Sequence, residues 1–153
     1  MILTPHAVLG AAIGSKIAYL PLAIVLALAS HYLLDLIPHA DYPIDNFREK
    51  KWRKAKFEIL SMIADSLLGL VLVFSIWQLS SANFLHILIP AFFGVAPDFL
   101  SFLFFLYPKN KFLKWHSNLH KKLHFLENKK FSINWRIISQ ILIILLSFLL
   151  ILL

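Results

Sequence analysis

Residues 57–79 read FEILSMIADSLLGLVLVFSIWQL, and a second apolar run follows at 84–107 after the short turn SSAN. A helix of about 20 apolar residues crosses a bilayer, so each run is long enough to span one. Because the turn between them is short, the two runs predict a transmembrane helical hairpin. Three more hydrophobic segments, at 4–18, 21–37 and 133–153, are predicted to pack with it.

The predicted fold class is therefore all-α. We expect a polytopic membrane helical bundle with about five hydrophobic helices, in a single domain that covers residues 1–153. Composition agrees, because 59% of the residues are hydrophobic and only 15% are charged, against about one-quarter charged in soluble domains. The chain has no cysteine. Disulfides and thiolate zinc sites are thereby excluded, and any metal site must use histidine and carboxylate.

The net charge of +7 comes mostly from basic residues at 47–56 and 109–130, between the hydrophobic segments. Juxtamembrane charge of this kind is typical of membrane proteins, so the expected partners are membrane lipids, and no nucleic acid is expected. The positive-inside rule assigns both basic stretches to the cytoplasm. This assignment is consistent with the hairpin, whose two ends must lie on one side, and it places the C-terminus outside.

Residues 4–37 can fold in two ways. A hairpin that turns near Tyr19 puts His6 on the same side as His39. One kinked span would instead place His6 roughly 35–40 Å from His31. We favour the hairpin, because a single span would be much longer than a bilayer requires. Glycines in the first segment are spaced to permit close helix packing.

The stretch SHYLLDLIPHADY, residues 30–42, collects four ionisable residues at the end of an apolar run. His31 and Asp35 are four positions apart, so they share one helix face and can grip one ion. A proline ends this helix, and His39 and Asp41 follow on extended chain that can fold back towards it. Imidazole and carboxylate ligands suit zinc, with manganese and iron as alternatives.

Asp65 and Asp98 lie inside the two long spans, about two turns from their cytoplasmic ends. A carboxylate within a span costs about 2.5–3.5 kcal/mol on insertion scales, so it should face the bundle interior and have a partner. The spans therefore predict that both aspartates contribute to a polar centre on the cytoplasmic side. A purely structural network between them is the alternative.

His116, His120 and His124 recur every four residues in a predicted amphipathic helix at about 110–126. At about 100° per residue they spread over ~80° of its surface, beside an apolar stripe. This pattern predicts an interfacial helix that lies on the membrane with its histidines directed inward. The three histidines are possible additional site residues.

Common catalytic motifs do not occur in this chain. HExxH is absent, as are the GxSxG elbow and the dinucleotide fingerprint. With four glycines in total, a backbone phosphate cradle is not expected. A bound metal is the best remaining source of electrophilic chemistry.

The sequence MILTPHAVLGAAIG at 1–14, followed by SHYLLDLIPHAD at 30–41, resembles the YdjM-like family of bacterial inner-membrane proteins. Members are described as membrane-bound metal-dependent hydrolases. The family is distantly similar to the zinc-dependent phospholipase C superfamily, all-helical enzymes that hold a metal cluster with histidine and aspartate. GVAPD at 94–98 resembles the family's GxxPD, and residues 115–124 resemble a later stretch that contains histidines.

The resemblance implies a location in the bacterial cytoplasmic membrane and a divalent metal, with zinc as the expected ion. It also implies a set of site residues on this chain, namely His6, His31, Asp35, His39, Asp41 and Asp98, followed by Asp65 and the later histidines.

The predicted function is metal-dependent hydrolysis, with a phosphoester that is lipid-linked as the substrate. His31 and Asp35 would bind the ion together with one or two of His6, His39 and Asp98. Asp41 or Asp65 would orient the water or act as general base. Two alternatives stay open: a non-enzymatic membrane protein whose polar cluster is structural, and a metal transporter. The sequence does not indicate the oligomeric state.

Overall fold

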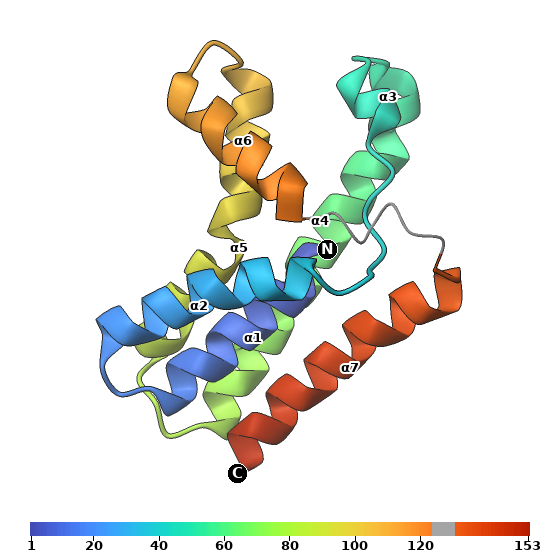
Figure 1. Ribbon diagram of the computed structural model, residues 1–153. Helices are drawn as coiled ribbons and strands as arrows, with labels where there is room; N and C mark the ends of the chain where they lie inside the picture. Colours follow the sequence, from blue (N-terminus) through green and yellow to red (C-terminus); the bar gives the residue numbers. More distant parts are fainter. Residues whose placement is uncertain (124–130) are drawn as a thin grey trace.

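A computed structural model describes residues 1–123 and 131–153, and this part of the chain is helical and contains no strand (Figure 1). The helices, in chain order, are α1 (Leu3–Lys16), α2 (Leu20–Asp35), α3 (Asp45–Arg48), α4 (Trp52–Leu79), α5 (Phe84–Leu106), α6 (Lys111–Leu123) and α7 (Ile133–Leu152). The predicted all-α class is confirmed for the described residues.

Three helices are long and apolar enough to cross a bilayer, namely α4, α5 and α7. They correspond to the predicted segments at 57–79, 84–107 and 133–153, and they indicate a membrane protein. The segments at 4–18 and 21–37 form α1 and α2, which at 14 and 16 residues are shorter than a full span. Of the predicted interfacial helix at 110–126, α6 covers all but the ends. The last part, including His124, lies outside the described residues.

α1 and α2 form the hairpin rather than one kinked span. The rings of His6 and His31 stack with their centroids 4.1 Å apart, so the start of α1 and the end of α2 lie together. A single span would separate these rings by the length of two helices. The hairpin is thus the arrangement that brings two candidate ligands to one place.

α1 lies at the centre of the bundle and packs against α2, α4, α5 and α7. Its central residues are small, which lets the neighbouring backbones come close. A Cβ added at Gly10 would lie 2.6 Å from the carbonyl oxygen of Pro90, and one at Gly14 would lie 2.1 Å from that of His86. The predicted close packing at these glycines is confirmed, and its partner is α5.

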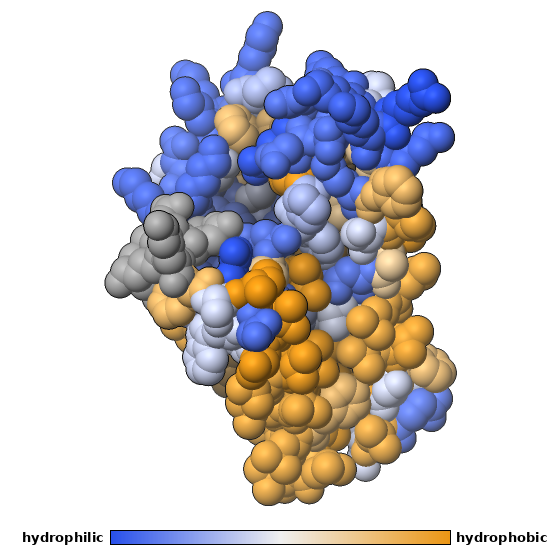
Figure 2. Space-filling view, turned by 90° about the vertical axis from the view of Figure 1, so that its right-hand side faces the viewer, coloured by the Kyte–Doolittle hydropathy of each residue, from blue (hydrophilic) through white to orange (hydrophobic). Residues whose placement is uncertain are grey.

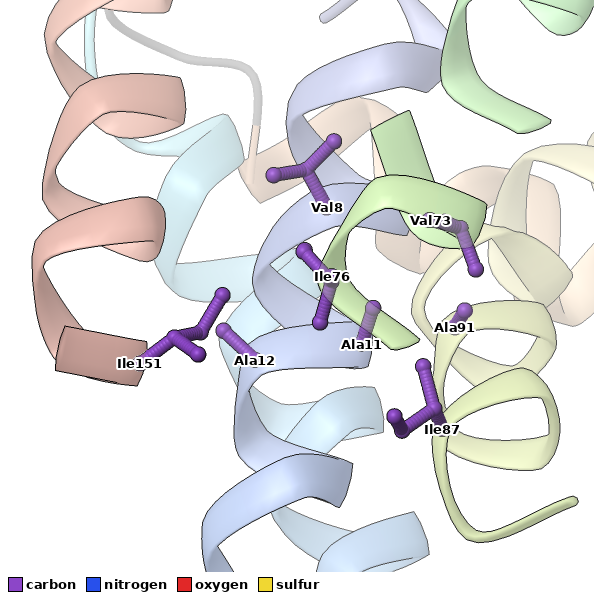
Figure 3. Packing of buried hydrophobic residues seen from close by; sticks show 8 residues of the cluster. All are labelled: Val8, Ala11, Ala12, Val73, Ile76, Ile87, Ala91 and Ile151. Atoms are coloured by element: carbon purple, nitrogen blue, oxygen red, sulfur yellow. The ribbon is translucent and has the colours of Figure 1, made fainter. Parts of the chain in front are cut away.

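An apolar core surrounds α1 (Figure 3). Figure 3 shows side chains from α1, α4, α5 and α7 gathered around the middle of α1; they are Val8, Ala11, Ala12, Val73, Ile76, Ile87, Ala91 and Ile151. Burial of these apolar side chains stabilises the bundle around the middle and end of α1. The start of α1 lies outside this core and carries polar groups.

The outer surface divides into an apolar body and a hydrophilic end (Figure 2). On the face shown there, hydrophobic residues cover the lower part and hydrophilic residues the upper part. The exposed faces of α4 and α7 are rich in large apolar side chains such as Phe57, Leu70 and Leu146. By contrast, seven histidine and aspartate residues are buried, namely His6, His31, Asp35, His39, Asp65, His116 and His120. Apolar groups outside and polar groups inside suit a chain whose surroundings are lipid.

Candidate metal centre

The end of α2 supplies the first two residues of a polar cluster. His31 and Asp35 are 0% and 1% exposed and lie one turn apart on the same helix face. Their Nε2 and Oδ2 atoms are 3.1 Å apart. The predicted pairing of these residues across one helical turn is confirmed.

α5 and α6 complete the cluster. Nε2 of His120 lies 2.9 Å from Oδ2 of Asp35 and 3.1 Å from Nε2 of His31. Oδ1 of Asp98 is 3.6 Å from the His120 nitrogen and 3.9 Å from the His31 nitrogen. The four potential ligand atoms all lie within 4.8 Å of one another. Three helices therefore bring two imidazoles and two carboxylates to one point.

These separations are compatible with a metal-ligand set. With zinc–nitrogen and zinc–oxygen bonds near 2.0–2.1 Å, tetrahedral ligand atoms lie roughly 3.3 Å apart. The atoms of His31, His120 and Asp35 are 2.9–3.1 Å apart, and those of Asp98 are somewhat farther away. The four residues could hold a divalent metal ion with only small adjustments of the side chains.

Outer hydrogen bonds orient the two imidazoles. Nδ1 of His31 lies 2.7 Å from the carbonyl oxygen of Gly94, which can only accept, so Nδ1 must donate. In the neutral ring, Nε2 then presents a lone pair to the cluster. Nδ1 of His120 lies 3.1 Å from the hydroxyl of Ser101. If Nδ1 of His120 donates to this hydroxyl, Nε2 of the neutral ring presents its lone pair to the cluster. This arrangement is typical of metal-bound histidine.

The carboxylate of Asp98 also has an oxygen atom that a cation would satisfy. Among the described residues its buried Oδ2 atom has no hydrogen-bond partner. A buried carboxylate oxygen without a donor is costly, and a cation removes that cost. The donor set, the separations and this oxygen all fit a metal.

His6 of α1 lies against the other side of Asp35. Its Nε2 atom is 3.2 Å from Oδ1 of Asp35, and the amino group of Met1 is 3.3 Å from the same oxygen. Neither ring nitrogen of His6 has a hydrogen bond within the described part of the chain. His6, predicted as a ligand, is thus adjacent to the group of four but outside it.

His39 and Asp41 form a neighbouring pair on the chain after α2. Nε2 of His39 is 3.2 Å from Oδ1 of Asp41, which also lies 2.8 Å from the Met1 amino group. Partial burial alone would raise the pKa of Asp41. The hydrogen bond with His39 and the positive amino group outweigh this and hold the pKa well below its usual range. The roles predicted for these two residues stay predictions.

Asp65 is engaged by the start of α1. Its Oδ2 accepts from the backbone N–H of Thr4 at 3.1 Å and from the hydroxyl of Tyr42, while its carbonyl accepts from the Thr4 hydroxyl at 2.9 Å. Burial and then the bond to Asp65 raise the pKa of Tyr42. Asp65 lies outside the group of four, and its contacts are those of a helix cap supplied by another helix.

His116 supports the cluster from α6. It is buried, its Nε2 lies 3.2 Å from the hydroxyl of Tyr32, and its ring stacks on His120 with centroids 5.8 Å apart. Burial and then the neighbouring His120 lower the pKa of His116, which favours the neutral ring. Of the three later histidines, His120 is in the group of four and His116 is next to it, while His124 lies outside the described residues.

Three residues that organise the site are not predicted from the sequence: Ser101, Tyr32 and Tyr42. Only Ser101 carried a usable signal, because it follows Asp98 by three positions and therefore shares its helix face. The two tyrosine contacts depend on how α6 and α1 meet α2 and the chain that follows it.

No protein-family model, curated protein or solved structure matches this chain. The resemblance to the YdjM-like family accordingly stays a prediction from the sequence.

Proposed function

We propose that this chain is a membrane-bound metal-dependent hydrolase that acts on a lipid-linked phosphoester. The observation that carries the proposal is the convergence of His31, Asp35, Asp98 and His120 on one point inside a bundle with an apolar exterior. Zinc is the favoured ion, because two imidazoles and two carboxylates at these separations match its ligands and geometry. The resemblance of residues 3–42 to a family described as metal-dependent hydrolases points in the same direction.

The charges of the cluster favour an ion over a purely structural network. Among the ion pairs between described residues, the partners of Asp98 are His31 and His120, and no lysine or arginine takes part. Two carboxylates at this depth need positive charge close by. A divalent cation would balance both.

The cluster is most exposed at Asp98. The side chains of His31 and Asp35 are 0% exposed, whereas that of Asp98 is 22% exposed and its ligand atom lies farthest from the others. A substrate would therefore approach on the Asp98 side. Bound here, a divalent metal supplies Lewis acidity that polarises a phosphoryl oxygen and acidifies a water molecule. Asp41, whose side chain is 32% exposed, is the candidate to accept a proton from that water.

The position of the site supports a lipid substrate. Asp98 lies within α5, a candidate span, and α3 and α6 with their basic residues lie at the same end of the molecule (Figure 1). A phosphoester in the headgroup layer would meet both the cluster and this positive charge. By the positive-inside rule that end faces the cytoplasm, and the family resemblance suggests the bacterial inner membrane.

Metal content of the purified protein tests the proposal first. We expect about one or more zinc, manganese or iron ions per chain by elemental mass spectrometry, lost in a His31→Ala/Asp35→Ala variant that stays folded. His86→Gln is the matched control, since His86 lies at the far end of α5 and bonds to the Ala18 carbonyl.

A panel of phosphoesters in mixed micelles then tests hydrolysis. The expected result is metal-dependent turnover of at least one lipid substrate that the double variant lacks. No metal in either protein, with lower stability of the variant, would make the cluster structural. Metal-coupled flux in proteoliposomes without hydrolysis would make the chain a transporter.

A further inference from the structure

An apolar groove of about 390 Å³ lies between α4 and α5, beside the start of α1. One face of α4, from Ile59 to Leu67, forms its floor, and Leu3, Phe47 and Phe102 complete it. Figure 1 shows that α4 and α5 diverge towards the end that carries α3 and α6. The groove lies in the space where these two helices diverge.

Hydrocarbon is the expected occupant because of where the groove lies. Its two walls belong to candidate spans, and α4 residues beside it, such as Leu60 and Leu68, are 60% and 50% exposed. An apolar surface that is open at this depth of a bilayer meets lipid tails rather than water. The groove is continuous with the exposed apolar face of α4.

The groove includes a residue of α5 that is close in the chain to a candidate metal ligand. Phe102 follows Asp98 by one turn of α5, a rise of about 6 Å. On the α4 side, Ser66 directly follows Asp65, and Leu3 precedes the Thr4 N–H that Asp65 binds. A chain that lies in the groove therefore passes within one helical turn of Asp98.

The polar end of the groove carries an aromatic bridge and positive charge. Phe47 packs against Phe102 and Phe105, with ring centroids 6.2 and 5.2 Å apart. The exposed side chain of Arg48 follows Phe47, and exposed Lys56 precedes Ile59 by one turn of α4. A molecule with an apolar tail and an anionic head matches this order of surfaces.

We propose that the groove binds one acyl chain of an anionic membrane lipid, with the lipid headgroup at the polar end beside Arg48 and Lys56. That the bound lipid is also the substrate rests on the proposed function. Binding of the chain does not, because it depends on the groove alone.

Photo-crosslinking of the full-length, metal-loaded protein tests the binding. The probe is a phosphatidylglycerol with a diazirine in its acyl chain, mixed into phosphatidylethanolamine vesicles. Mass spectrometry of the peptides should place the label preferentially on Ile59–Leu67 and Phe102. Labelling spread evenly over the exposed faces of α4 and α7 would overturn the proposal.

Groove-filling variants sharpen this test. Ser66→Phe and Leu67→Trp should lower labelling of the groove at least fivefold, whereas Val71→Trp, at an exposed α4 position outside the groove, should leave it unchanged. Leu67 is 58% exposed, so its substitution leaves the core intact and gives a result even where Ser66→Phe fails to fold. Undiminished labelling in folded Leu67→Trp protein would contradict the assignment.

Turnover separates this inference from the proposed function. If the wild-type protein hydrolyses phosphoesters, the ratio of long-chain to short-chain turnover should fall about tenfold in Leu67→Trp. An unchanged ratio would show that the groove does not hold the substrate. If the wild-type protein hydrolyses nothing, the proposed function fails, and the crosslinking result alone decides whether the groove binds lipid.

Discussion

The Nε2 atoms of His31 and His120 lie 3.1 Å apart, although 89 positions separate the two residues in the chain. Nδ1 of His31 donates to Gly94, so at least one of the facing nitrogens presents a lone pair. A proton or a cation must lie between them. His120→Ala is therefore expected to weaken zinc binding by more than about 100-fold, beyond the loss typical of an outer-shell partner. Titration against a competing chelator measures the change.

His116→Ala is the comparison for this variant, because His116 stacks on His120 without joining the group of four. We expect it to reduce affinity much less than His120→Ala does. Equal losses in the two variants would show that α6 contributes packing rather than a ligand.

Ser101 should raise the zinc affinity of the site without being a ligand itself. Its hydroxyl lies 3.1 Å from Nδ1 of His120 and fixes the orientation of that ring. Ser101→Ala is expected to lower zinc affinity roughly 10- to 100-fold, as loss of an outer-shell partner does. Ser147→Ala removes another buried serine, whose hydroxyl, among the described residues, donates to the Ile143 carbonyl within α7, and should leave affinity unchanged. A Ser101→Ala protein with wild-type affinity would remove the serine from the site.

The sequence predicted best what depends on one helix. His31 and Asp35 are paired by spacing alone, and the cost of a buried charge predicted that Asp98 faces the interior. His120 was only a possible site residue, because its place depends on how α6 folds back against α2 and α5. That packing leaves no local pattern in the chain.

Element boundaries show the same limit. α4 begins at Trp52 rather than at residue 57, because hydropathy marks only the apolar part of a helix whose basic first turns are also good helix formers. α3 has four residues, too few for a periodicity. It depends on Glu58, which accepts hydrogen bonds from the backbone of Asn46 and Phe47. This contact exists only once α4 has formed.

Asp65 could act as a cap for the start of α1 or as a general base, and the sequence alone did not distinguish these roles. As a cap for α1, it should tolerate replacement by asparagine, which keeps an acceptor for the Thr4 N–H, but not by alanine. We expect Asp65→Ala to destabilise the protein by about 1–2 kcal/mol and Asp65→Asn by clearly less. Chemical unfolding in detergent micelles measures both. If Asp65→Asn instead abolishes hydrolysis at full stability, Asp65 is the general base that the sequence suggested.

Close contact between α1 and α5 holds His6 beside Asp35, and Gly94 makes it possible. A Cβ at this position would lie 2.6 Å from the carbonyl oxygen of His6, a backbone atom that cannot move alone. Gly94→Ala should therefore force the helices apart and destabilise the fold by about 1–3 kcal/mol, as overpacking does. The same shift would displace the Gly94 carbonyl that orients His31, so zinc affinity should fall as well.

Gly69→Ala provides the matched control, because the added Cβ there would meet the Thr4 side chain at 3.3 Å and not a backbone carbonyl. Thermal unfolding and chelator competition on both variants separate packing from ligation. We expect Gly69→Ala to change both quantities much less than Gly94→Ala does. Full stability and full zinc affinity in Gly94→Ala would mean that α1 and α5 can separate at this point without disturbing the metal centre, and the positioning role of Gly94 would then be wrong.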